Sequence, residues 1–180
     1  MTTTTPRPDA DIDPITPFED VLAANGRYAE TFRLAGLEPR AARGLAVLTC
    51  MDSRIEPLQM LGLRPGDAKI LRNAGARVTD DVLRTLALAV HLLGVERVLV
   101  VPHTRCRMAA GSAEDLHRAV YEASGIDTRS LDLRPSTDLE ATLSEDLQRI
   151  RSWPYLPAGL AVLGAVYDVD TGRLRPLPEA

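Results

Sequence analysis

The 180-residue sequence is poor in aromatic side chains, in lysine and in cysteine. Aromatic residues make up 4% of the chain and hydrophobic residues 45%, so we expect a core of Leu, Val, Ala and Ile in one compact domain. No apolar run approaches the roughly 20 residues that a membrane-spanning helix needs. The net charge of -4 provides no basic face of the kind that binds nucleic acid. We therefore expect neither membranes nor nucleic acids as partners.

The chain has only two cysteines, Cys50 and Cys106. Two cysteines can form one disulfide, but we recognise no secretory signal, and we expect a cytoplasmic protein with reduced thiols. Residues 1–14 are rich in Thr, Pro and Asp and contain no apolar run. We expect a flexible N-terminal segment over 1–14 and a single folded domain over 15–180.

Hydrophobic patterning predicts strands that alternate with helices. Helical spacing and capping residues predict helices over 17–35, 82–93, 109–123 and 137–151, a short helix after Pro57, and N-caps at Thr79 and Thr137. Short apolar runs predict buried strands over 45–50, 68–71, 97–101 and 159–168. Such alternation is typical of an α/β fold with a central, mainly parallel sheet flanked by helices.

Metal-ligating side chains follow two of the predicted strands. Cys50 ends the strand over 45–50, and His103 and Cys106 follow the strand over 97–101. Sites form at the carboxyl ends of parallel strands, so these side chains meet at one edge if the two strands are neighbours. Zinc binds Cys sulfur and His nitrogen, and three protein ligands leave a fourth position open, as in catalytic sites. The sequence therefore predicts a catalytic zinc site on Cys50, His103 and Cys106.

Two charged residues close to Cys50 are the predicted catalytic pair. The guanidinium of Arg54 suits bidentate pairing with the carboxylate of Asp52. This pairing would keep Asp52 ionised and off the metal, where it accepts a hydrogen bond from a zinc-bound hydroxide. Zinc generates such a nucleophile near neutral pH.

Each of these features also has a simpler explanation. A cysteine after a buried strand is often a small core residue, and an exposed Asp–Arg pair is worth under about 1 kcal/mol. A redox pair or a disulfide between Cys50 and Cys106 is a further alternative. Because all of the features fall at predicted strand ends, we favour the metal site. His91 and His117 lie inside predicted helices, and we expect them to be packing or surface residues.

The segment Cys50-Met51-Asp52-Ser53-Arg54, followed by His103-Thr104-Arg105-Cys106, resembles the β-class carbonic anhydrases. Other segments resemble the small bacterial members, and the similarity runs over roughly residues 18–176. These segments are residues 24–28, 72–75, 79–84 and 166–174. One departure is Arg107, which follows Cys106 where the family usually has glycine.

This resemblance implies a zinc lyase that reversibly hydrates carbon dioxide to bicarbonate and a proton. It implies zinc on Cys50, His103 and Cys106, and an Asp52–Arg54 dyad. It also implies a homodimer or a dimer of dimers, with the N-terminal helix packed on the partner. Some relatives hydrolyse carbonyl sulfide or carbon disulfide at the same kind of zinc site, which is the alternative activity. A non-catalytic zinc-binding protein is a third alternative, although such a protein has no need of the dyad.

Overall fold

The computed structural model describes residues 15–178 of the chain. The chain divides into two units, one up to Leu37 and one from Glu38. The segment predicted to be flexible, residues 1–14, lies outside the described residues, and the single domain over 15–180 stays a prediction. In the first unit, a 3-10 turn (Thr16–Phe18) leads into helix α1 (Glu19–Glu30), which has two acidic residues in its first turn that favour a helix N-terminus.

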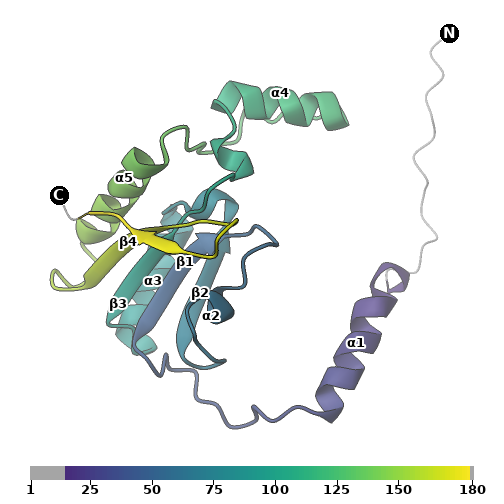
Figure 1. Ribbon diagram of the computed structural model, residues 1–180, viewed down its shortest axis with the longest axis vertical. Helices are drawn as coiled ribbons and strands as arrows, with labels where there is room; N and C mark the ends of the chain where they lie inside the picture. The colour runs from purple at the N-terminus through teal and green to yellow at the C-terminus, as the bar shows by residue number, and fades with distance from the viewer. Residues whose placement is uncertain (1–14, 179–180) are drawn as a thin grey trace. The chain divides into compact units, whose positions relative to one another are not determined.

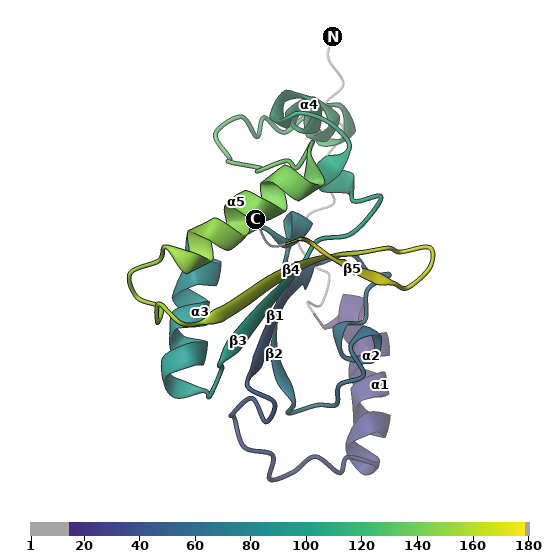
Figure 2. The ribbon, with the colours of Figure 1, turned by 60° about the vertical axis from the view of Figure 1, so that its left-hand side comes forward.

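The second unit is built on a five-stranded sheet (Figures 1 and 2). Its strand order is β2-β1-β3-β4-β5; β1 to β4 run parallel, and β5 pairs antiparallel with β4. The strands are β1 (Leu45–Cys50), β2 (Ala68–Asn73), β3 (Arg97–Val101), β4 (Ala161–Tyr167) and β5 (Leu174–Pro176). The predicted mainly parallel sheet is confirmed, and β5 is an addition that the sequence did not indicate.

Four helices and two 3-10 turns complete the second unit. They are α2 (Pro57–Met60), the turn Ala74–Ala76, α3 (Asp80–Leu92), the turn Arg107–Ala109, α4 (Ala113–Ser124) and α5 (Leu139–Arg151). The side chain of Thr79 accepts a hydrogen bond from the Val82 N–H and caps α3, as predicted.

The four longer helices start two to four residues from the predicted positions, and in two of them the capping residue explains the difference. The helix expected from residue 109 begins as α4 at Ala113, because Ser112 and Asp115 form a reciprocal capping box. The predicted N-cap Thr137 is wrong, since Asp138 caps α5 by accepting a hydrogen bond from the Ala141 N–H. Both errors arise because several residues near a helix start can act as the cap.

The main core joins the sheet to α3 and α5. Strand residues such as Leu48 and Val100 pack in one cluster with Leu83 and Leu86 of α3 and with Leu143 of α5. The buried members of this cluster are all Val, Leu, Ile or Ala, which confirms the core expected from the scarcity of aromatic residues. Among the described residues, no helix is long and apolar enough to cross a membrane.

The pairing of β1 with β3 positions the site. The two strands run parallel in the register Leu45↔Arg97 to Thr49↔Val101, so they end side by side. The hydroxyl of Thr49, which is fully buried, donates a hydrogen bond to the Val101 carbonyl at 2.8 Å. Cys50 therefore ends β1 at the same edge of the sheet where the chain leaves β3 toward His103.

Candidate metal centre

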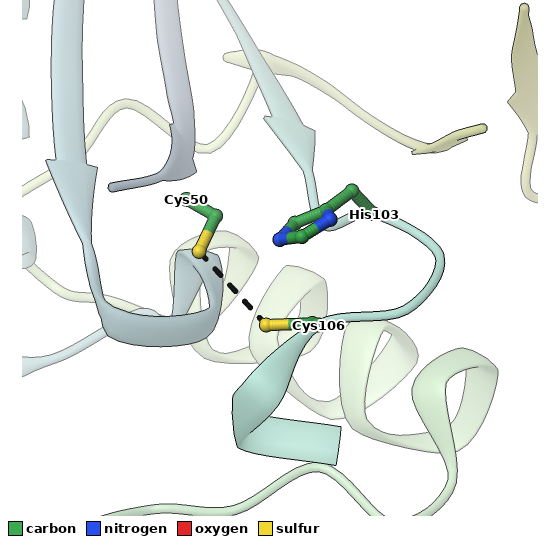
Figure 3. Close-up of side chains that lie close together, drawn as sticks. All are labelled: Cys50, His103 and Cys106. Atoms are coloured by element: carbon green, nitrogen blue, oxygen red, sulfur yellow. Dashed lines mark hydrogen bonds between the residues drawn. The ribbon is translucent and has the colours of Figure 1, made fainter. Parts of the chain in front are cut away.

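Cys50, His103 and Cys106 converge at this edge of the sheet (Figure 3). The two sulfur atoms are 3.9 Å apart, and the ligand atoms of the three residues all lie within 4.8 Å of one another. All three side chains are buried, and both cysteines are free thiols. The structure thus brings together the three residues that the sequence predicts as metal ligands.

The hydrogen bonding of His103 prepares one ring nitrogen for a metal. Its Nδ1 lies 2.9 Å from the carbonyl oxygen of Thr104. A carbonyl only accepts hydrogen bonds, so Nδ1 carries the hydrogen and Nε2 keeps a free lone pair. Nε2 is buried and has no hydrogen-bond partner, which is costly for a polar atom. A metal ion would satisfy it, and the Nδ1–H···O=C bond is the support that ligating histidines usually have.

The contact between the two sulfur atoms shifts the pKa values of both thiols. The contact with Cys106 lowers the pKa of Cys50; burial opposes this shift, while the Gly75 N–H adds to it. The same contact raises the pKa of Cys106, as does its burial. Both thiols must lose their protons to ligate a cation, so metal binding would release protons. The donor set of two sulfurs and one imidazole nitrogen fits a metal ion of the zinc type.

A carboxylate held by a guanidinium lies beside these ligands. Arg54 donates from Nε to Asp52 Oδ1 at 2.9 Å and from Nη2 to Oδ2 at 2.7 Å, and its backbone N–H also donates to Oδ1. Oδ2 of Asp52 is 3.7 Å from Nε2 of His103. The hydrogen bonds from Arg54 hold the pKa of the Asp52 carboxyl well below its usual range. The structure therefore places an ionised carboxylate beside the free ring nitrogen of one of the three candidate ligands.

Comparison with known proteins identifies the family. The family model for carbonic anhydrase matches residues 45–174, a span that holds all three candidate ligands and the Asp52–Arg54 pair. β-Carbonic anhydrase 1 of Mycobacterium tuberculosis is 36% identical over 161 residues, covering 89% of this chain and 97% of the relative. The chain belongs to the β-carbonic anhydrase family.

Two other relatives show the breadth of this similarity. A carbon disulfide hydrolase of Acidithiobacillus thiooxidans is 30% identical over 154 residues, which cover 74% of this chain and 77% of that protein. The crystal structure of a carbonic anhydrase from Streptococcus mutans superposes with a TM-score of 0.83 at 37% identity, covering 89% of this chain and 97% of that one. The chain is thus similar both to proteins named carbonic anhydrase and to a protein named carbon disulfide hydrolase.

The Asp-x-Arg pairing that lies beside the centre occurs three times over residues 15–178. Asp127 pairs with Arg129, and Asp132 with Arg134, through the same combination of backbone and guanidinium donors to the carboxylate. Such a pair is therefore a local turn motif that needs no metal. Among the described residues, only the Asp52 pair contacts His103, so its location beside the candidate ligands distinguishes it from the other two pairs.

Contacts that the sequence did not reveal hold the dyad in place. Arg72 donates to the carbonyl oxygens of Cys50 and Asp52 at 3.0 and 2.7 Å, and Arg54 Nη2 also donates to the carbonyl oxygen of Arg105 at 3.2 Å. Arg72 lies on β2, opposite Thr49 of β1. Only the pairing of β1 with β2 brings Arg72 to Cys50. No spacing in the sequence predicts this contact.

The two arginines that flank Cys106 are accommodated differently. Arg105 has a left-handed backbone (φ 53°) and forms an ion pair with Asp170, in the segment between β4 and β5. Arg107 is exposed and begins a 3-10 turn without a positive φ. An arginine in place of the usual glycine at position 107 therefore causes no backbone strain.

The other two histidines lie outside the centre, as expected. His91 on α3 contacts the carbonyl oxygen of Tyr155, and His117 on α4 contacts the hydroxyl of Thr128. Both use a ring nitrogen in a hydrogen bond, and neither belongs to the candidate metal cluster among the described residues.

Replacing Arg54 with alanine should raise the pKa of Asp52 toward that of an ordinary carboxyl group. Arg54 is the principal cause of the low value, so in Arg54→Ala the carboxylate should be lost at a higher pH as the metal-free protein is acidified. Carbon-13 NMR titration of the aspartate carboxyls measures this shift. Arg129→Ala is the matched control and should move only Asp127; an unchanged Asp52 titration in Arg54→Ala would contradict the assignment.

Proposed function

We propose that this protein catalyses the reversible hydration of carbon dioxide to bicarbonate and a proton, with zinc held by Cys50, His103 and Cys106. The observation that carries the proposal is the Asp52 carboxylate, ionised and 3.7 Å from the free Nε2 of His103. Structural zinc sites are closed by four protein ligands, whereas this cluster has three and a fixed acceptor beside them. That arrangement suits a site that orients water.

Zinc is the metal that this donor set favours. Thiolate and imidazole together select zinc over calcium or magnesium, which prefer oxygen ligands. When bound, zinc lowers the pKa of a coordinated water to near neutrality, as is known for carbonic anhydrases with three histidine ligands. The thiols must be reduced to ligate a metal, and both are free here, which supports a cytoplasmic location.

Asp52 and Arg54 are the proposed catalytic residues. Both oxygens of Asp52 accept hydrogen bonds from Arg54, so the carboxylate is held in one orientation and is kept from moving freely toward the ligands. As an anion it can only accept hydrogen bonds. It therefore selects the orientation of a nearby water or hydroxide in which the hydrogen points to Asp52 and an oxygen lone pair is free to attack carbon dioxide.

Hydrolysis of carbonyl sulfide or carbon disulfide is the second candidate. The similarity to a carbon disulfide hydrolase over 74% of this chain supports it. The side chains around the two cysteines also include apolar ones, Ile55, Met60 and Met108, which suit any small, uncharged, linear substrate. A non-catalytic zinc-binding role is the weakest alternative, because it gives no role to the position of the Asp52 carboxylate beside His103.

We also propose that the protein is a homodimer or a dimer of dimers. Helix α1 has 12 residues, and a helix of this length is only marginally stable in water by itself. Within this unit taken by itself, Phe18, Val21 and Leu22 are not covered, and a second copy of the chain would cover them. Sedimentation equilibrium should give twice or four times the chain mass of 19.6 kDa; a monomer at micromolar concentration would contradict this proposal.

Stopped-flow measurement of carbon dioxide hydration by the zinc-loaded protein tests the main proposal. Rapid proton release, with one zinc per chain, is the expected result. Release of sulfide from carbonyl sulfide or carbon disulfide without carbon dioxide hydration would instead establish the second candidate. Absence of all three activities in fully zinc-loaded protein would leave the non-catalytic alternative and refute both enzymatic ones.

The variant Asp52→Asn should separate catalysis from metal binding. The amide keeps the size of the side chain but loses its charge, so we expect kcat to fall by about 100-fold or more while zinc content stays at the wild-type level. Asp127→Asn is the matched control, because Asp127 forms the same kind of pair with Arg129 away from the centre. Wild-type turnover in Asp52→Asn would remove Asp52 from the mechanism.

A further inference from the structure

A backbone N–H group also contacts the metal centre. The chain between β2 and α3 forms a loop, residues 73–77, in which the N–H of Gly75 donates to Sγ of Cys50 at 3.4 Å. Hydrogen bonds to a metal-bound sulfur reduce the electron density that it donates, and they are among the ways in which a protein tunes its metal. The position of this loop therefore matters to the chemistry of Cys50.

The conformation of this loop requires support. Gly75 and Ala76 both have left-handed backbones, with φ of 80° and 59°, and a non-glycine residue disfavours that region. The side chain of Asn73 bridges the loop, since its amide oxygen accepts from the Arg77 N–H at 2.9 Å and its amide nitrogen donates to the Arg77 carbonyl at 2.7 Å. Arg77 is thus the point at which the loop is fastened.

Arg77 is in turn fixed by a buried carboxylate on α5. Its Nε donates to Asp146 Oδ2 at 2.7 Å and its Nη2 to Oδ1 at 3.4 Å, and the Val78 N–H also donates to Oδ2. The side chains of Arg77 and Asp146 are only 14% and 6% exposed. Replacing a buried ion pair by apolar residues is often neutral or stabilising, so stability alone does not explain this pair. The hydrogen bonds of Asp146 instead fix the position of Arg77, and with it the position of the loop.

We propose that Asp146 is a positioning residue of the metal centre, which acts through Arg77 to keep the Gly75 N–H on the Cys50 sulfur. Three successive sets of hydrogen bonds connect them: Asp146 to Arg77, Arg77 to Asn73 across the loop, and Gly75 to Cys50. The inference rests on the proposed ligand set of the metal but not on the identity of the substrate.

The variant Asp146→Asn in the full-length, Co²⁺-loaded protein tests this inference. The sulfur-to-cobalt charge-transfer band reports the electron density on the thiolates. Loss of the Gly75 hydrogen bond makes the Cys50 sulfur a stronger donor, so the band should move to longer wavelength. Because the Gly75 N–H then no longer holds the Cys50 sulfur in position, competition with a chelator should nevertheless show metal affinity lowered by about 10- to 100-fold. A band at the wild-type wavelength, with affinity within about twofold of wild type, would overturn the proposal.

Two further variants distinguish a specific effect on the metal centre from a general loss of stability. Arg77→Lys keeps the buried positive charge but loses the forked contact with Asp146, and it should move the band in the same direction; no shift in a folded Arg77→Lys protein would contradict the proposal. Asp127→Asn breaks an exposed Asp–Arg pair and should leave both readouts unchanged. An equal shift in Asp127→Asn would show that the effect is not specific to Asp146, which also overturns the proposal.

The positioning role of Asp146 and the proposed carbon dioxide hydration are tested by different measurements. The band is measured without substrate, so a shift in Asp146→Asn supports the positioning role even if the wild-type protein does not hydrate carbon dioxide. A wild-type protein that binds Co²⁺ without any sulfur charge-transfer band would instead refute the proposed ligand set, and this inference with it.

Discussion

The parallel pairing of β1 with β3 is the constraint on which the site depends. Since both strands end at the same edge of the sheet, Cys50 meets the loop that carries His103 and Cys106, more than 50 residues away in the sequence. The buried hydrogen bond from Thr49 to the Val101 carbonyl ties the two strand ends together. A shift of one residue in this register would turn the Cys50 side chain to the other face of the sheet and separate the ligands.

Around this edge, arginines rather than lysines hold the polar elements in place. Arg54 orients Asp52, Arg72 holds the carbonyl groups of the Cys50 turn, and Arg77 fastens the neighbouring loop to Asp146. Each uses the planar fork of the guanidinium to make two or more directed hydrogen bonds, which a lysine ammonium does not reproduce. The sequence contains a single lysine, and the cationic side chains that orient this site are all arginines.

Much of the site was predictable because its residues lie where strands end. The apolar runs before Cys50 and His103 are clear in the sequence, and their alternation with helices predicts parallel strands. Contacts that depend on strand order were not predictable, and Arg72 is the clearest example, since only the β1–β2 pairing brings it to Cys50. The role of Asp146 was hidden for the same reason: on α5 it is one acidic residue among several, and only packing buries it against Arg77.

We propose that two cysteines and one histidine from these two strand ends hold a single zinc ion. Zinc K-edge X-ray absorption of the metal-loaded protein identifies the ligands. We expect one zinc per chain, with two sulfur ligands at about 2.3 Å and an imidazole nitrogen at about 2.0–2.1 Å. A spectrum with no sulfur ligand, or with only one, would show that the converging ends of β1 and β3 do not form the metal site.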